Sequence, residues 1–163
     1  MIDLASECRR TSDARQYSKL DAAQHQLEAA IAKLFLGNWP AAITLAGAAE
    51  DVLPPKSDKA DLFSVAKTLG EARHGKTPKE IADLLNEKRN WLKHDQQNTT
   101  SPIQDITQED AVIMVLRAAT RFGAHHAPLE PGEALCEALV VFRQWFTTQY
   151  RDWLVTEPAK DKS

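Results

Sequence analysis

Cysteine is scarce in this chain, which has only Cys8 and Cys136 among its 163 residues. The two lie far apart in the sequence, and this excludes a CxxC metal knuckle and the cysteine framework of a small disulfide-bonded protein. Idle or buried thiols are the simplest interpretation of both. The sequence therefore predicts no metal site, and we expect no cofactor.

Long apolar runs and a basic excess are also missing. No run of about 18 apolar residues occurs, so the sequence predicts no membrane-spanning segment. The N-terminus, MIDLASECRRTSDAR, meets charged residues too early for a signal peptide, and we expect a cytoplasmic protein. The formal net charge is −3, so any contact with nucleic acid must depend on a local cluster of cations.

The rest of the composition is that of an ordinary globular protein, with 43% hydrophobic and 26% charged residues. A chain of this size fits one domain, which we place at residues 1–156, followed by a frayed tail at 157–163. Proline, glycine and capping residues divide the sequence into helix-length segments. We therefore predict an all-α fold, an antiparallel bundle of about five to six helices.

The first two segments show the clearest pattern. Apolar residues at helical spacing predict a long first helix, which ends near Gly37, a residue suited to the left-handed position past a helix end. The stripe consists of Tyr17, Leu20, Leu27, Ile31 and Leu34. The second segment, PAAITLAGAAEDVL, is small and apolar almost all round. We expect it to be central, with Gly47 allowing close approach by neighbours and Glu50 reaching solvent at the helix end.

The sequence predicts four further helices. The third runs through residues 62–69, and the fourth opens at TPKE, where Thr77 and Glu80 form a capping box. The fifth is predicted from Thr107 to Gly123. The last passes through Leu135, Leu139, Phe142, Phe146 and Trp153.

The fourth helix carries polar residues in the stretch RNWLKH, residues 89–94. At about 100° per residue, its apolar positions share one face, which we predict to be the core face. These positions are Ile81, Leu84, Leu85, Trp91 and Leu92. Arg89, Asn90, Lys93 and His94 form a continuous polar arc, in which Arg89 and His94 lie about 140° apart. The two converge on one group only if the helix ends at His94 or if two subunits meet.

These residue types suit cleavage of a phosphodiester without a metal. An imidazole moves protons near neutral pH, a guanidinium binds two phosphate oxygens, and an ammonium adds a point charge. In RNA the 2′-hydroxyl is a built-in nucleophile. His94 would transfer a proton while Arg89 stabilises the charge that gathers on the phosphate.

The stretch RNWLKH resembles the Arg, polar residue and His motif of HEPN domains, which are bundles of four to five helices. The helical layout of residues 17–122 is similar as well, and AAITLAGAAEDVL followed by RNWLKH resembles a group of uncharacterised bacterial HEPN-like proteins. Many HEPN proteins are metal-independent ribonucleases or toxins of toxin–antitoxin pairs, and they act as dimers with one composite site. The resemblance thus implies a homodimer, an RNA substrate and an antitoxin or other protein partner.

The same resemblance assigns roles to single residues. Arg89 would stabilise the phosphate, Asn90 would orient the reacting groups, and His94 would transfer protons. Lys93 is not part of the resemblance, and we assign it to substrate binding because its ammonium adds a point charge. Some toxin members carry a tyrosine two places after the histidine, which the antitoxin modifies. This chain has Gln96 there, a departure from that mode of regulation.

Two other hypotheses explain the same residues. TPKEIADLLNEKRNWLKH can be threaded on a helix-turn-helix that presents Arg89, Asn90 and Lys93 to a DNA major groove. That hypothesis requires a break near Asn86, whereas the HEPN hypothesis requires a helix unbroken through Trp91. The third hypothesis is a non-catalytic module whose polar arc binds a nucleotide phosphate or a protein partner.

A second match to the motif spacing, RFGAHH at residues 121–126, lacks the polar residue after the arginine. It also contains Gly123. We interpret it as a helix end rather than a site.

Overall fold

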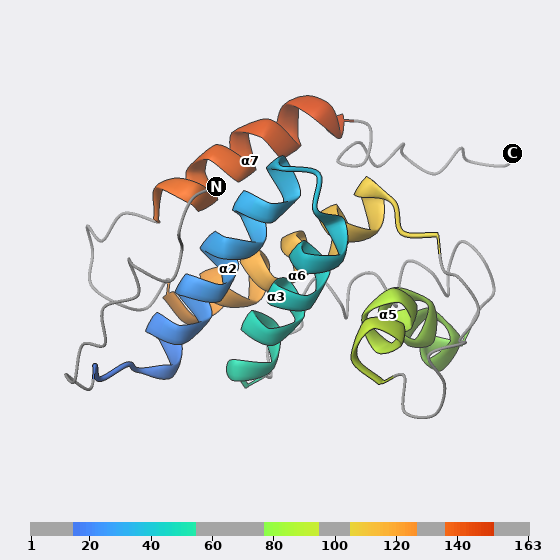
Figure 1. The fold of residues 1–163 in the computed structure, drawn as a ribbon, viewed down its shortest axis with the longest axis horizontal. Coiled ribbons are helices and arrows are strands. Elements are labelled where there is room, and N and C mark those ends of the chain that lie inside the picture. Colours follow the sequence, from blue (N-terminus) through green and yellow to red (C-terminus); the bar gives the residue numbers. More distant parts are fainter. Residues whose placement is uncertain (1–14, 55–76, 95–104, 127–135, 152–163) are drawn as a thin grey trace, which may run out of the picture.

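The computed structural model describes residues 15–54, 77–94, 105–126 and 136–151 (Figure 1). These ranges form five α-helices and contain no strand, so the predicted all-α class and bundle architecture are confirmed. The helices are α2 (Lys19–Phe35), α3 (Trp39–Val52), α5 (Pro78–His94), α6 (Gln108–His126) and α7 (Glu137–Gln149). The helix predicted across residues 62–69 and the tail at 157–163 lie outside the described residues.

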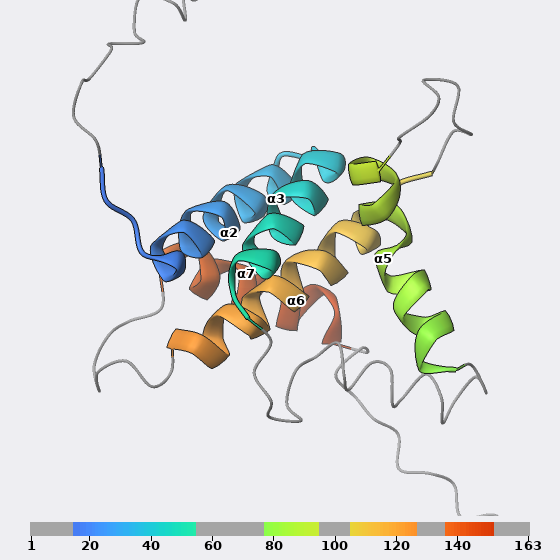
Figure 2. The same cartoon turned by 90° about the horizontal axis from the view of Figure 1, so that it is seen from below.

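Helix α3 is central, as its small apolar residues predict. It contacts α2, α5 and α6, while α2 also contacts α6 and α7. Figures 1 and 2 show α2 and α3 side by side, with α5 standing at one side of the molecule. No helix in the described ranges is long and apolar enough to cross a membrane.

Helix α2 begins and ends at the residues best suited to do so. Ser18 is its N-cap and forms a capping box with Asp21, and the hydrogen bonds from Ser18 hold the pKa of Asp21 below its usual range. Gly37 follows the helix with φ +72°, which confirms its left-handed conformation. The prediction that Tyr17 belongs to the apolar stripe of this helix is wrong, because the residue precedes the helix and is 53% exposed.

The core lies mainly between α2, α3 and α6. It consists of the apolar faces of these helices, covered by three buried residues of α7. The largest fully buried apolar side chains are Leu27, Ile43, Val112, Val115, Phe122 and Phe142.

Helix α5 starts at the predicted capping box. The Thr77 hydroxyl donates to Glu80 Oε2 at 2.8 Å, and the Glu80 amide donates to the Thr77 hydroxyl at 3.3 Å. The predicted core face is wrong at Leu84, which is 60% exposed. Near the end of α5, Leu92 packs against the apolar core. A helix at the side of a bundle does not bury a full apolar stripe.

Helix α6 starts as predicted and ends later. The backbone amide and hydroxyl of Thr107 donate to Asp110 Oδ2 at 2.8 Å, and the helix begins at the next residue. It continues past Gly123 to His126, because glycine weakens a helix by only about 1 kcal/mol and does not stop it. Near its end, His125 Nε2 lies 2.8 Å from the carbonyl oxygen of Pro54.

Candidate functional site

The polar residues predicted as a site lie beside a charged cluster, and the centre of this cluster is Glu50. The sequence predicts that this carboxylate reaches solvent at the end of α3, and this prediction is wrong. Glu50 is instead only 2% exposed, because the last turns of α3 face α6 and the inner side of α5. A buried carboxylate is stable only when cations and hydrogen-bond donors surround it.

Arg117 of α6 provides the closest partner. Its Nη2 donates to Glu50 Oε1 at 3.0 Å and to Oε2 at 2.9 Å. Its Nη1 donates to the carbonyl oxygen of Leu85 at 3.1 Å and to Asn86 Oδ1 at 3.0 Å. One side chain thus joins α3, α5 and α6. Burial lowers the pKa of the Arg117 guanidinium, and the charge of Glu50 opposes this effect.

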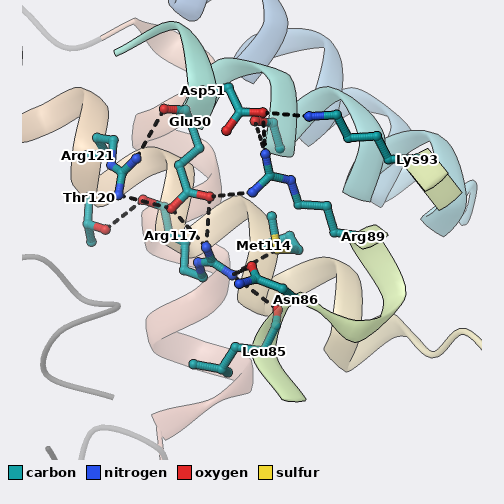
Figure 3. Close-up of polar contacts among 11 residues, drawn as sticks. Glu50, Asp51, Leu85, Asn86, Arg89, Lys93, Met114, Arg117, Thr120 and Arg121 are labelled. Carbon is teal, nitrogen blue, oxygen red and sulfur yellow. Dashed lines mark hydrogen bonds and ion pairs between the residues drawn. The ribbon is translucent and has the colours of Figure 1, made fainter. Parts of the chain in front are cut away.

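Two more guanidinium groups reach Glu50. Arg121 Nη2 lies 3.4 Å from Oε1, and Arg121 Nη1 donates to the backbone carbonyl of Glu50 at 3.2 Å. Arg89 Nη1 of α5 lies 3.6 Å from Oε2. Figure 3 shows Arg117 and Arg121 approaching the carboxylate from α6 and Arg89 approaching from α5.

The next residue of α3, Asp51, binds two cations of α5, Arg89 and Lys93. Arg89 Nη2 donates to Asp51 Oδ2, and Lys93 Nζ lies 3.3 Å from the same oxygen (Figure 3). Partial burial alone would raise the pKa of Asp51. The hydrogen bonds and charges of Arg89 and Lys93 outweigh burial and hold that pKa below its usual value.

Gly47 explains how Arg89 comes so close to α3. A Cβ atom at this position would lie 2.7 Å from Arg89 Nε, closer than Cβ atoms approach other groups in proteins, and 3.1 Å from Arg89 Cδ. The carbonyl of Gly47 also accepts from Arg89 Nη2 at 3.5 Å. The predicted close approach across the small-residue face of α3 is therefore confirmed, and the group that approaches is a charged side chain.

A hollow of about 160 Å³ opens beside these groups. It is lined by Thr44, Gly47, Ala48, Asp51, Arg89, Leu92 and Lys93. The side chain of Lys93 is 55% exposed and that of Asp51 is 48% exposed, whereas that of Arg89 is only 15% exposed. The exposed part of the cluster thus borders the hollow.

The residues of the predicted polar arc lie in different environments in the structure. Arg89 faces α3 and Lys93 reaches Asp51, whereas Asn90 is exposed. His94 is the last residue of α5, and its side chain is not among those that the structure describes. The helix is continuous from Pro78 to His94, so the break near Asn86 that a helix-turn-helix requires does not occur.

Four cations and two carboxylates meet in what we call the charged cluster: Arg89, Lys93, Arg117 and Arg121 with Glu50 and Asp51. Cations exceed carboxylates by two. A local positive excess of this kind attracts anions even on a chain whose formal net charge is −3. In the described residues no group of histidine, cysteine, aspartate and glutamate side chains could hold a metal ion.

Sequence reasoning missed Arg117 as a partner of Glu50. A signal was present, because this arginine interrupts the apolar run AVIMVL and stands four residues before Arg121. Two arginines one turn apart share a helix face. A buried carboxylate on a neighbouring helix would then be their natural partner.

Comparison with known proteins finds no relative of this chain. No protein-family model, no curated protein and no solved structure matches this chain.

Proposed function

We propose that this protein is an HEPN-like, metal-independent endoribonuclease of the toxin type, which acts as a homodimer with a composite site. The observation that carries the proposal is the arrangement of the last turns of α5. Arg89 and Lys93 are presented next to a hollow within a cluster of positive excess, and exposed Asn90 stands beside them. RNA has the matching chemistry, a chain of phosphates with a nucleophilic hydroxyl next to each.

The reaction needs no metal or added co-reactant. The His94 imidazole accepts the proton of a 2′-hydroxyl, whose oxygen attacks the adjacent phosphorus. The bond from phosphorus to the 5′-oxygen breaks, and that oxygen takes a proton from water. The hydroxide that remains takes the proton from the His94 imidazolium, which returns the histidine to its neutral form. The products are a 2′,3′-cyclic phosphate and a free 5′-hydroxyl. Arg89 and Lys93 stabilise the negative charge on the phosphate oxygens, and Asn90 orients the substrate.

The direction of Arg89 supports the proposal of a composite site. Its guanidinium faces α3 of its own subunit, and Arg89 and His94 stand about 140° apart around a regular helix. We propose that Arg89 of one subunit and His94 of the other serve the same phosphate. Glu50 holds the guanidinium close to α3, and this preorganises its positive charge.

A second candidate is a non-catalytic module that binds phosphate groups. One observation favours it: the Arg89 guanidinium is already bound to Asp51, Glu50 and the carbonyl of Gly47. A residue in this state stabilises the α3–α5 contact whether or not any chemistry takes place. Binding would then depend mainly on Lys93 and Asn90, which are exposed.

One assay distinguishes the ribonuclease from the non-catalytic binding module. The purified protein is incubated with a mixed RNA pool in excess EDTA, beside His94→Ala and Asp83→Asn. Asp83 is an exposed residue of the same helix and serves as the control. The ribonuclease proposal predicts cleavage by the wild type and the control and none by His94→Ala. RNA that is bound by the wild type but stays intact would favour the binding module.

A further inference from the structure

We infer that the Asp51 carboxylate occupies an oxyanion site formed by Arg89 and Lys93, so that a phosphate group binds there only by displacing it. Asp51 would act as a built-in competitor that sets how tightly the site binds phosphate. The inference rests on the proposed function in assigning a phosphate to this site, but its test does not require cleavage.

Two cations of α5 converge on one atom of Asp51. Arg89 and Lys93 are one turn apart on α5, and both donate to a single atom, Oδ2 of Asp51. A guanidinium and an ammonium that meet at one carboxylate oxygen also suit one oxygen of a phosphate. The donor geometry of an oxyanion site is thus present, with its ligand supplied by the chain itself.

The site formed by Arg89 and Lys93 is also accessible from solvent. The Asp51 side chain is 48% exposed and that of Lys93 is 55% exposed, so the carboxylate can rotate into solvent without being buried elsewhere. The adjacent hollow of about 160 Å³ provides room for an incoming group. Glu50 differs in both respects, because it is 2% exposed and held by arginines of α6.

Charge also allows a phosphate group to replace Asp51. If Asp51 moves away, Glu50 remains paired with Arg117 and Arg121, and Arg89 and Lys93 face the incoming anion. A single phosphodiester carries the same charge as the carboxylate that it replaces. Asp51 has the advantage of being attached to the chain, so an isolated phosphate competes poorly. A polyanion such as RNA competes better, because several contacts act together.

The test compares Asp51→Asn with Asp83→Asn. Both variants remove one negative charge from the chain. Asp83 is exposed and precedes Lys93 by ten residues on α5, which is about 15 Å along a helix. The asparagine at position 51 keeps the shape of the side chain and an acceptor oxygen for Arg89.

Calorimetric titration with two probes measures the affinity of each variant and of the wild type. The probes are inorganic phosphate and a DNA oligonucleotide, which lacks the 2′-hydroxyl and cannot be cleaved by the proposed route. We expect Asp51→Asn to bind both probes at least about fivefold tighter than the wild type, and Asp83→Asn to change affinity by less than about twofold, since exposed charges at such distances are screened. A gain for the oligonucleotide alone would assign the site to a polynucleotide backbone rather than to free phosphate.

Equal affinities of Asp51→Asn and Asp83→Asn for both probes would overturn the inference. Lys93→Ala gives a second test that does not depend on the stability of the Asp51 variant, because Lys93 is mainly exposed. It should weaken oligonucleotide binding, and unchanged binding would also contradict the inference. A gain in phosphate binding without any RNA cleavage would leave the oxyanion site in place and reject only the ribonuclease proposal.

Discussion

Arg117 of α6 donates from one nitrogen atom to both carboxylate oxygens of Glu50 on α3, at 3.0 and 2.9 Å. Both residues are almost fully buried, at 4% and 2% exposure. The same guanidinium also binds the backbone of α5 at Leu85. This contact fixes the end of α3 against both neighbours, and it therefore positions the carboxylate that holds Arg89.

Replacing Glu50 should destabilise the protein strongly. Glu50→Ala leaves Arg117 buried without its anion, and removal of one partner of a buried ion pair costs about 3–5 kcal/mol. Glu50→Gln keeps the shape and one acceptor, so we expect a smaller loss. Chemical denaturation measures both. Glu87→Ala is the control, because Glu87 is an exposed glutamate of α5 and such changes stay within about 0.5 kcal/mol. Equal costs for Glu50→Ala and Glu87→Ala would contradict the role given to the charged cluster.

Alanine at position 47 should behave differently from alanine at position 123. Both glycines lie within helices, where alanine is favoured by about 1 kcal/mol. At Gly123 a Cβ meets nothing within 4 Å, whereas at Gly47 it would meet Arg89 Nε at 2.7 Å. We expect Gly123→Ala to raise the free energy of unfolding and Gly47→Ala to lower it.

A double variant identifies the cause of that difference. Arg89→Ala removes the atoms that the new Cβ would meet, so adding it to Gly47→Ala should recover part of the stability. If the two substitutions destabilise additively, contact between these residues is not the reason.

The pH dependence of stability should report the state of Asp51. Its pKa is lowered in the folded protein, and the usual value in an unfolded chain is about 3.9. The unfolded state thus binds more protons in this range, so the contribution of Asp51 is complete above about pH 5 and is lost as the pH falls through the folded value.

Urea unfolding at a series of pH values measures this effect. Asp51→Asn should lose less stability than the wild type between about pH 5 and pH 3. Asp21 titrates in the same range in both proteins, so the difference between the two curves isolates Asp51. Parallel curves would show that Asp51 does not contribute through its charge.

The sequence predicts local features of this fold well, because they depend on neighbouring residues. The capping box at Thr77, the left-handed Gly37 and the central small-residue helix follow from propensity and spacing. The exposed Leu84 and the buried Glu50 were not predicted. Their environments depend on how far α5 lies from the other helices, and helical periodicity carries no information on that distance.

The candidate site illustrates the same division. The spacing on α5 places Arg89 and Lys93 one turn apart, as the structure has them. It does not reveal that Asp51 binds them, because these contacts join residues 38 and 42 positions apart in the sequence. The interruption of an apolar run by Arg117 was a local sign of the charged cluster.

A cleavage assay on mixed dimers tests the composite ribonuclease site most directly. Arg89→Met and His94→Ala chains with different tags are co-expressed, and the dimer that carries both tags is purified and checked for fold and oligomeric state. The methionine keeps an apolar stem beside Gly47. If Arg89 of one subunit and His94 of the other serve one phosphate, the wild type and the mixed dimer cleave RNA in excess EDTA, and each variant alone does not. A wild type without activity, or a mixed dimer as inactive as its parents, would contradict this account.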